Sequence, residues 1–215
     1  HVTPFGAQAT TNIYSYFNFV LQQYLCRIAV PFFFVCNGYF LFRKINFDDI
    51  NYNTIKKVAI KTLKLYIIWT VIYFPLNLIG IIKYEKGILL GVISYLRSFL
   101  VTGSYTQLWY LNALFVALVL IGILLKFKIK PITIFILSFI LYLIGLLDDT
   151  YYGIMNCIPF ISRLFEYYNY FFITTRNGVF DGFFFVSLGM ILSSSKRKIS
   201  NKKCYVLLVF SMLFM

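Results

Sequence analysis

The stretch that decides the fold is LWYLNALFVALVLIGILL, which runs from Leu108 to Leu125 without a charged residue. A helix of this length nearly crosses a bilayer hydrocarbon core of about 30 Å. Further uncharged runs of similar length lie at Leu65–Ile82 and Pro131–Leu147. The pattern predicts an all-α, polytopic transmembrane helix bundle.

The composition agrees with a bilayer protein. Hydrophobic residues make up 60% of the 215 residues, against roughly 45–50% in soluble domains, which excludes a water-soluble globular protein. The net charge of +13 comes from clusters between the apolar runs, so no single basic face for nucleic acid is expected. Four cysteines without a C-x-x-C pair, together with one histidine, provide no zinc site, and no metal is expected.

The basic clusters alternate along the chain and predict its orientation. If they are cytoplasmic, 14 of the 20 Lys and Arg lie inside, as the positive-inside rule requires. The sequence therefore predicts a multi-pass protein of the plasma membrane with residues 1–24, 83–107 and 148–175 outside. The predicted spans are residues 25–42, 65–82, 108–125, 131–147, 176–192 and an incomplete 204–215.

Both ends of the chain suggest a piece of a longer protein. It opens at His1 without a methionine and stops at Met215, a short apolar run after Cys204. We expect one partial membrane domain over residues 1–215, truncated at both ends within transmembrane segments. The predicted orientation places His1 towards the extracytoplasmic side.

One pattern, Phe-Phe-Phe-Val-x-x-Gly, ends at Gly38 and again at Gly189. Both copies lie in spans predicted to run inward. Glycines of this kind let helices approach closely, whereas a true internal repeat is typical of transporters. The other spans show no matching repeat, which favours close helix packing.

Polar groups at membrane depth are the candidates for chemistry, because an ionisable side chain there costs about 2.5–3.5 kcal/mol unless it is satisfied. His1 is the only histidine, and histidine is the residue type best suited to proton transfer near neutral pH. A terminal histidine can equally be incidental. Arg27 stands at the outer end of its span, either as a snorkelling anchor or as part of a site.

The fifth span carries the strongest polar signal. Its uncharged run, residues 182–195, is too short to cross the bilayer, so Arg176, Asn177 and Asp181 must share the membrane depth. In a helix, Asn177 and Asp181 stack one turn apart. A functional site and a structural ion pair both fit this pattern.

An aromatic pair, Trp109 and Tyr110, opens the third span, with Asn112 one turn deeper. Trp and Tyr at this position are commonly interface residues, and this interpretation stands beside a binding role. The tyrosine-rich segment 151–172 is expected to lie along the interface. The sequence contains no nucleotide-binding glycine loop, carboxylate pair or nucleophile elbow.

Four strings resemble blocks of the integral-membrane acyltransferase family, acyltransferase type 3. HVTPF from His1 resembles the end of the first helix of that family, where a histidine and a proline close the helix. RIAVPFFF from Arg27, followed by NGYFL from Asn37, looks like its second-helix signature. LWYL from Leu108 and RNGVFDG from Arg176 match two later blocks. The similarity covers nearly the whole chain, with the blocks in the correct order.

The resemblance is strongest to the branch with surface-polysaccharide O-acyltransferases and the membrane domains of serine/alanine racemases. Asn37 departs from the serine that the family often has there. An arginine that normally precedes the histidine and the last helices of the family lie outside this sequence. Part of the family's active site is therefore expected to be missing.

The resemblance implies transfer of an acyl group, usually acetyl from acetyl-CoA, to a hydroxyl of an envelope glycan or a lipid-linked acceptor. His1 would be the catalytic base or form an acyl-histidine, and the acyl-CoA would be a donor substrate rather than a bound cofactor. The residues expected to bind substrate or donor are Arg27, Asn37, Trp109, Tyr110, Asn112, Arg176, Asn177 and Asp181.

Two other classes of function stay open. A lipid or glycan translocator would line a path with polar groups, but the spans at 65–82 and 131–147 contain few of them. A non-catalytic membrane anchor or sensor for a downstream enzymatic domain would need no such groups. The richness in Ile, Lys, Asn, Phe and Tyr suggests a low-GC bacterium.

Overall fold

The computed structural model of the chain is helical throughout its described part. The described residues are 26–45, 47, 52–82, 84, 87–149 and 159–194. The chain divides into two units, and residues 34–194 form the larger one, to which the following description applies. His1 and the expected last span, 204–215, lie outside the described residues.

The described part contains helices and no strand, which confirms the all-α expectation. In chain order the elements are α2 (Cys26–Phe42), α3 (Tyr52–Ile82), α4 (Ile88–Val101), η2 (Thr106–Leu108), α5 (Trp109–Lys126), α6 (Pro131–Asp149), α8 (Pro159–Phe172), the π-helix η3 (Gly178–Gly182) and α9 (Phe183–Ser194).

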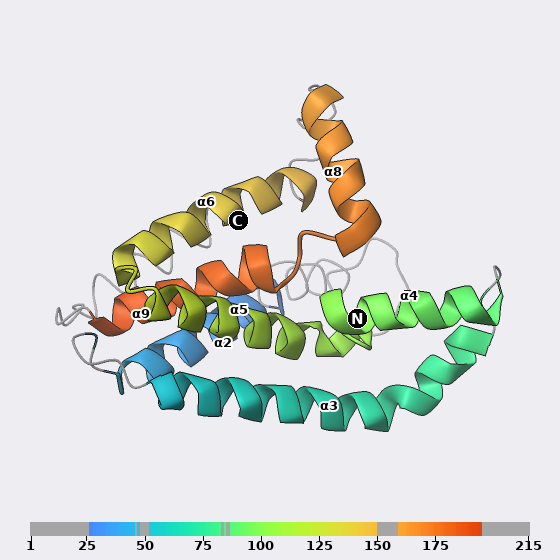
Figure 1. Cartoon of the computed structure of the whole chain (residues 1–215), viewed down its shortest axis with the longest axis horizontal. Helices are drawn as coiled ribbons and strands as arrows, with labels where there is room; N and C mark the ends of the chain where they lie inside the picture. The colour runs from blue at the N-terminus through green and yellow to red at the C-terminus, as the bar shows by residue number, and fades with distance from the viewer. Residues whose placement is uncertain are drawn as a thin grey trace, which may run out of the picture. The chain divides into compact units, whose positions relative to one another are not determined.

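Helix α5 is the central element of the larger unit. It packs against α3 and also against η3 and α9, while α6 covers α9 (Figure 1). Its inward positions are almost completely buried, and two of them, Ala113 and Ala117, are small enough to let η3 approach. The helix that the LWYL stretch predicts is therefore the one that the described parts of two other blocks contact.

Helix α3 is longer than the apolar run that predicted a span at 65–82. It begins at Tyr52, so the first lysines of the preceding polar stretch, including Lys56 and Lys61, lie on the helix itself. Lysine is a good helix former, and the lysine stems can cover apolar surface. Pro75 lies inside this helix, and the second half of α3 changes direction in Figure 1.

Residues 83–107, predicted to lie outside, contain no predicted span and were expected to be a loop, and the structure shows a helix over most of the segment. Helix α4 occupies Ile88–Val101 and packs back against α3. The apolar run of α4 is too short to cross a bilayer, so it was not predicted as a span, but it is long enough to form about four helical turns. Gly91 permits the contact, because a Cβ there would lie 2.8 Å from the carbonyl oxygen of Ile81.

The surface of these helices is suited to lipid. On α3 alone, Val71 is 66% exposed and Leu76 is 53% exposed, among many other large apolar side chains. Water-soluble proteins rarely expose apolar area on this scale. Two helical stretches of the described part, Tyr52–Ile82 and Ile88–Lys126, are long and apolar enough to cross a membrane.

The two copies of the Phe-Phe-Phe-Val-x-x-Gly pattern meet each other. A Cβ on Gly38 of α2 would lie 2.2 Å from the carbonyl oxygen of Val186 in α9. A Cβ on Gly189 would lie 2.2 Å from the carbonyl oxygen of Val35. Each glycine thus faces the backbone of the other copy, and the interpretation as close helix packing is confirmed.

Candidate functional site

The first turn of α5 receives side chains from α2. Asn37 donates a hydrogen bond from its side-chain nitrogen to the hydroxyl of Tyr110 at 2.8 Å. Phe34, which is completely buried, lies near both rings of the aromatic pair: its ring centroid is 4.6 Å from that of Tyr110 and 6.2 Å from that of Trp109. The second-helix block and the LWYL block therefore form one aromatic and polar cluster.

A set of hydroxyl contacts fixes where α5 begins. The hydroxyl of Tyr66 donates to the carbonyl of Phe99 at 2.6 Å and accepts from the backbone N–H of Ser104 at 2.9 Å. The next residue on that face of α3, Thr70, shares a hydrogen bond of 2.6 Å with the Ser104 hydroxyl. Gly103 has a φ of +106°, and a Cβ there would lie 2.8 Å from the nitrogen of Trp109. This turn sets the position of the tryptophan.

Asn112 is buried on α5 and ties this turn to the helix before it. Its side-chain nitrogen donates to the carbonyl of Leu100 at 3.3 Å. A buried amide without partners would be costly, so this bond explains how an asparagine is accommodated at this depth. The structure gives Asn112 a positioning role for the α4–α5 connection.

Asn177 is the best-connected residue of the fifth span. Its side-chain oxygen accepts from the N–H groups of Val179 at 2.9 Å and Phe180 at 3.3 Å, and its side-chain nitrogen donates to the Tyr168 hydroxyl at 2.7 Å and the Thr174 carbonyl at 2.9 Å. These groups belong to the last part of α8, to the segment that follows it and to η3. Asn177 therefore joins the end of α8 to the start of the next helix.

The predicted helical stacking of Asn177 and Asp181 needs a correction. Asn177 has extended backbone angles, φ −146° and ψ −174°, and the helix begins after it at Gly178 rather than near Arg176. The physical reason is capping, since the amide oxygen satisfies two N–H groups that a helix start leaves without partners. The backbone carbonyl of Asn177 accepts from the N–H groups of Asp181 and Gly182, both at 3.1 Å.

The glycines of the π-helical turn η3 pack closely against α5. A Cβ on Gly178 would lie 2.7 Å from the carbonyl oxygen of Ala113, and a Cβ on Gly182 would lie 2.8 Å from the same oxygen. No larger residue fits this contact without moving the backbone. The R-N-G-x-F-x-G block thus needs both glycines to reach the helix that carries Asn112. π-Helical turns are often found at functional sites.

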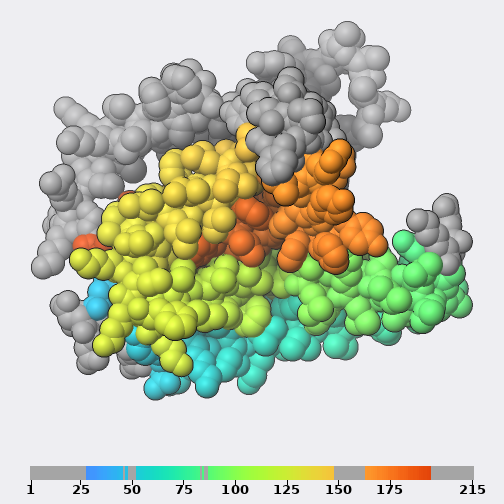
Figure 2. Space-filling view, turned by 45° about the horizontal axis from the view of Figure 1, so that its top comes forward, coloured from blue at the N-terminus to red at the C-terminus, as the bar shows by residue number. Residues whose placement is uncertain are grey.

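Arg97 of α4 holds the end of α8. Its guanidinium donates to the carbonyls of Phe171 at 2.9 Å and Asn169 at 2.8 Å, and also to that of Tyr170. These carbonyls are the last of the helix, where the dipole favours a cation. Figure 2 shows α8 lying against α4. Ile173, the first residue after α8, has a φ of +67°, so the chain turns sharply towards Asn177.

The structure thus brings three of the four blocks onto one helix. Trp109, Tyr110 and Asn112 lie in the first turn of α5, Asn37 of α2 bonds Tyr110 there, and η3 packs one turn further along. Arg176 is exposed and Asp181 is half-buried at the edge of this arrangement. His1 lies outside the described residues, and so does the side chain of Arg27. No group of metal-ligating side chains is found in the described part.

Comparison with known proteins identifies the arrangement. The family model described as acyltransferase domain matches residues 1–215. The chain belongs to the integral-membrane acyltransferase family. Membrane acyl transfer is therefore the general activity associated with its family. No solved structure gives a significant match.

The relatives of this acyltransferase domain carry racemase names. An amino-acid racemase of Enterococcus faecalis is 34% identical over 194 residues, which cover 89% of this chain and 27% of that protein. A serine/alanine racemase of Enterococcus gallinarum is 32% identical over 191 residues, covering 85% of this chain and 26% of that protein. The chain spans about a quarter of the length of the curated relatives it matches. These names agree with the expected branch.

Sequence reasoning missed two positioning residues of this acyltransferase domain, Arg97 and Tyr168. Arg97 lies in residues 83–107, which were predicted to be outside, and Tyr168 lies in the tyrosine-rich segment 151–172, which was expected along the interface. Both act through helix ends, on Asn169 and Asn177 respectively. One sequence signal could have indicated the role of Arg97: it is the charged residue of an otherwise uncharged run that forms α4.

Proposed function

We propose that this chain is the membrane part of an O-acyltransferase, which transfers an acetyl group from acetyl-CoA to a hydroxyl of a cell-envelope glycan or a lipid-linked acceptor. Family membership supports acyl transfer in general. The single observation that carries the assignment to this chain is the assembly of three family blocks on the first turns of α5, through Asn37, Tyr110 and Gly178.

In the proposed reaction the acceptor hydroxyl loses its proton to His1, and its oxygen attacks the thioester carbonyl carbon. The C–S bond breaks, an O-acyl ester forms, and the CoA thiolate takes up the proton. In the alternative scheme, the imidazole nitrogen of His1 attacks the thioester carbonyl carbon and the C–S bond breaks, which gives an acyl-histidine and the CoA thiolate. The acceptor oxygen then attacks the acyl carbon, the C–N bond breaks, and the hydroxyl proton passes to the thiolate. Both schemes conserve protons and electrons without a further reactant.

Cations near the outer end of the bundle would serve the donor. Arg27 and Arg176 are proposed to bind the phosphates of CoA or to polarise the thioester carbonyl, because guanidinium groups suit both tasks. Asp181 is proposed to orient them. Asn177 is proposed to act indirectly, since its amide is engaged in capping the helix that carries Asp181.

The proposed setting is the plasma membrane, crossed several times, with His1 on the extracytoplasmic side. The alternation of basic clusters supports this orientation. Acetyl-CoA is cytoplasmic, so its acyl end would have to reach into or through the bundle. The acceptor would then be modified on the outer side.

The test is incorporation of labelled acetyl into envelope material by membranes that carry the full-length parent protein. We expect transfer by the unaltered protein and none by His1→Ala, with equal insertion of both. Lys61→Gln, on the exposed face of α3, is a matched control that should transfer normally. Normal transfer by His1→Ala would contradict the catalytic assignment.

A second candidate is supported by the racemase names of the relatives, of which this chain matches about a quarter. In that case the domain would anchor a downstream enzyme or sense a ligand for it. Membranes would then show no acetyl transfer, and purified protein would not bind acetyl-CoA. If both experiments are negative while insertion is normal, the anchor is preferred, and a transport assay tests the translocator.

A further inference from the structure

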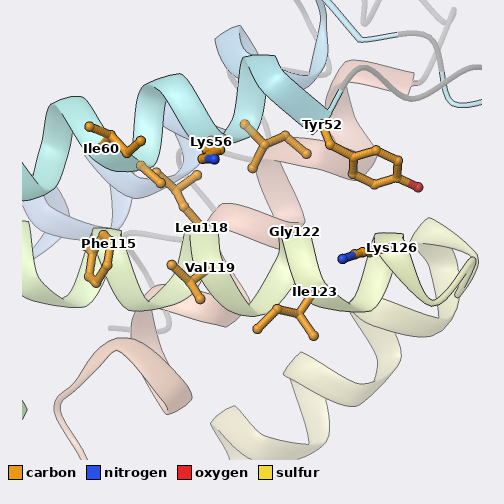
Figure 3. A pocket seen from close by; sticks show the side chains of 11 residues that line it. Tyr52, Lys56, Ile60, Phe115, Leu118, Val119, Gly122, Ile123 and Lys126 are labelled. Carbon is orange, nitrogen blue, oxygen red and sulfur yellow. The ribbon is translucent and has the colours of Figure 1, made fainter.

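A groove lies between α3 and α5, at the opposite end of α5 from the acyl-transfer cluster. Its volume is about 470 Å³, within the range of roughly 300–1,000 Å³ of small-ligand sites. Figure 3 shows side chains of both helices pointing into it. The lining residues are Tyr52, Ile55, Lys56, Ala59, Ile60, Phe115, Leu118, Val119, Gly122, Ile123 and Lys126.

The walls of the groove are apolar and open to the lipid side of the bundle. Ile60 on α3 is 40% exposed and Ile123 on α5 is 47% exposed, whereas Leu118 on the floor is buried. Ala59 and Gly122 make room between the helices, because both lack a long side chain. A hydrocarbon chain entering from the bilayer would find a continuous apolar surface.

Two lysines give the groove its charge. Lys56 comes from α3 and Lys126 from the last turn of α5, and both line the same groove (Figure 3). Among the described residues neither lysine has an ion-pair partner. The hydroxyl of Tyr52 donates to the carbonyl of Leu125 at 3.1 Å and joins the two helices at this end. Two cations therefore face one apolar groove, and an anion would complement them.

We propose that this groove binds an anionic glycerophospholipid of the bilayer, with one acyl chain along the apolar walls and the phosphate at Lys56 and Lys126. A soluble phosphate would leave the walls empty, and a zwitterionic lipid would bring a cation together with its phosphate and leave the two lysine charges without a net counterion. Basic pockets between helices are a known way of binding lipid headgroups. The predicted orientation places this end in the cytoplasmic leaflet, where anionic lipids are attracted to basic segments.

The experiment measures lipid binding to the full chain in mixed micelles, comparing phosphatidylglycerol with phosphatidylcholine of the same acyl chains. Native mass spectrometry counts the bound lipids. Lys56→Gln with Lys126→Gln removes both charges at the groove. The matched control is Lys57→Gln with Lys61→Gln, which removes two charges from α3 at positions that do not line the groove.

We expect the double groove variant to lose about 25-fold in its preference for phosphatidylglycerol, at roughly fivefold per lysine. The control variant should keep the preference. Gly122→Leu provides a test without a charge change: a Cβ at residue 122 meets the Ile55 side chain at 3.4 Å, so a leucine fills the groove. It should abolish binding of both lipids at this site.

Three results would overturn the proposal. One is the absence of any preference for phosphatidylglycerol in the unaltered protein, as expected if another protein segment fills the groove. Another is an equal loss in the control variant, which would indicate general electrostatic attraction. The third is unchanged binding in Gly122→Leu when its thermal unfolding matches that of the unaltered protein.

Discussion

Asn37 and Tyr110, 73 residues apart in the chain, share a hydrogen bond of 2.8 Å that joins α2 to the first turn of α5. The bond connects two of the sequence blocks that resemble the acyltransferase family. Buried Phe34 packs beside it. Loss of this hydrogen bond should therefore disturb the assembly of the candidate site.

Tyr110→Phe removes the acceptor of this bond and keeps the ring. We expect a loss of about 1 kcal/mol in the free energy of unfolding, as for other hydrogen bonds between membrane helices, together with reduced acyl transfer. Thermal unfolding in detergent measures the first effect. Tyr105→Phe is the control, because Tyr105 stacks on Tyr73 at 4.6 Å through its ring. Equal effects of both variants would contradict a special role for Asn37.

Gly38→Ala and Gly189→Ala should each separate α2 from α9, because the added Cβ would lie 2.2 Å from a backbone oxygen. Overpacking of this kind costs about 1–3 kcal/mol. Gly80→Ala makes the same chemical change in α3, where nothing lies within 4 Å of the new Cβ. That variant should be neutral or up to about 1 kcal/mol more stable. Thermal unfolding of the three variants in detergent measures these differences. Equal stability of all three would contradict the close contact between α2 and α9.

Arg97→Gln should loosen the end of α8. The guanidinium contributes about 1–2 kcal/mol through its bonds to the last carbonyls, so hydrogen exchange of residues 165–175 should accelerate. Acyl transfer should fall as well, since Asn177 follows this segment. Arg163→Gln, an exposed change on α8 itself, should leave the exchange unchanged. Acceleration in both variants would show that the loss of a positive charge near α8 matters rather than the Arg97 contacts.

Two substitutions at Asn177 separate its acceptor from its donors. Asn177→Ala loses every side-chain bond and should cost about 1 kcal/mol or more in stability. Asn177→Asp keeps an oxygen for the Val179 and Phe180 N–H groups but loses the donors to Tyr168 and Thr174. We expect it to be less damaging, because a negative charge is favourable at a helix start. If both variants are equally unstable, capping is not the contribution of Asn177.

The helical membrane fold could be predicted because uncharged runs such as Leu108–Leu125 permit few alternatives in lipid. The packing of the helices could not. A helix that is apolar all round, like α5, carries no periodic signal for which side faces a neighbour. Close helix packing at Gly38 was predicted as one interpretation of a repeated pattern, but its partner α9 was not. Helix α4 was missed because a search for spans passes over helices too short to cross the bilayer.

The roles of the candidate site residues stay predictions, but their protein contacts could not be predicted from the sequence. Asn37, Tyr110 and Asn112 were chosen as substrate contacts, and in the structure each has a protein partner. Asn177 was expected within a helix and lies before it. Side-chain to backbone bonds depend on where a helix ends, and a difference of one or two residues changes them. The roles of His1 and Arg27 stay predictions.

The mutual contact of Gly38 and Gly189 also sets an order of assembly during synthesis. Helix α2 enters the membrane early, but the backbone that its glycine faces belongs to α9, about 150 residues later in the chain. Until the ribosome has delivered Gly189, the α9 backbone that Gly38 faces has not been made. The close contact between α2 and α9 can therefore form only after nearly all of this sequence has been translated.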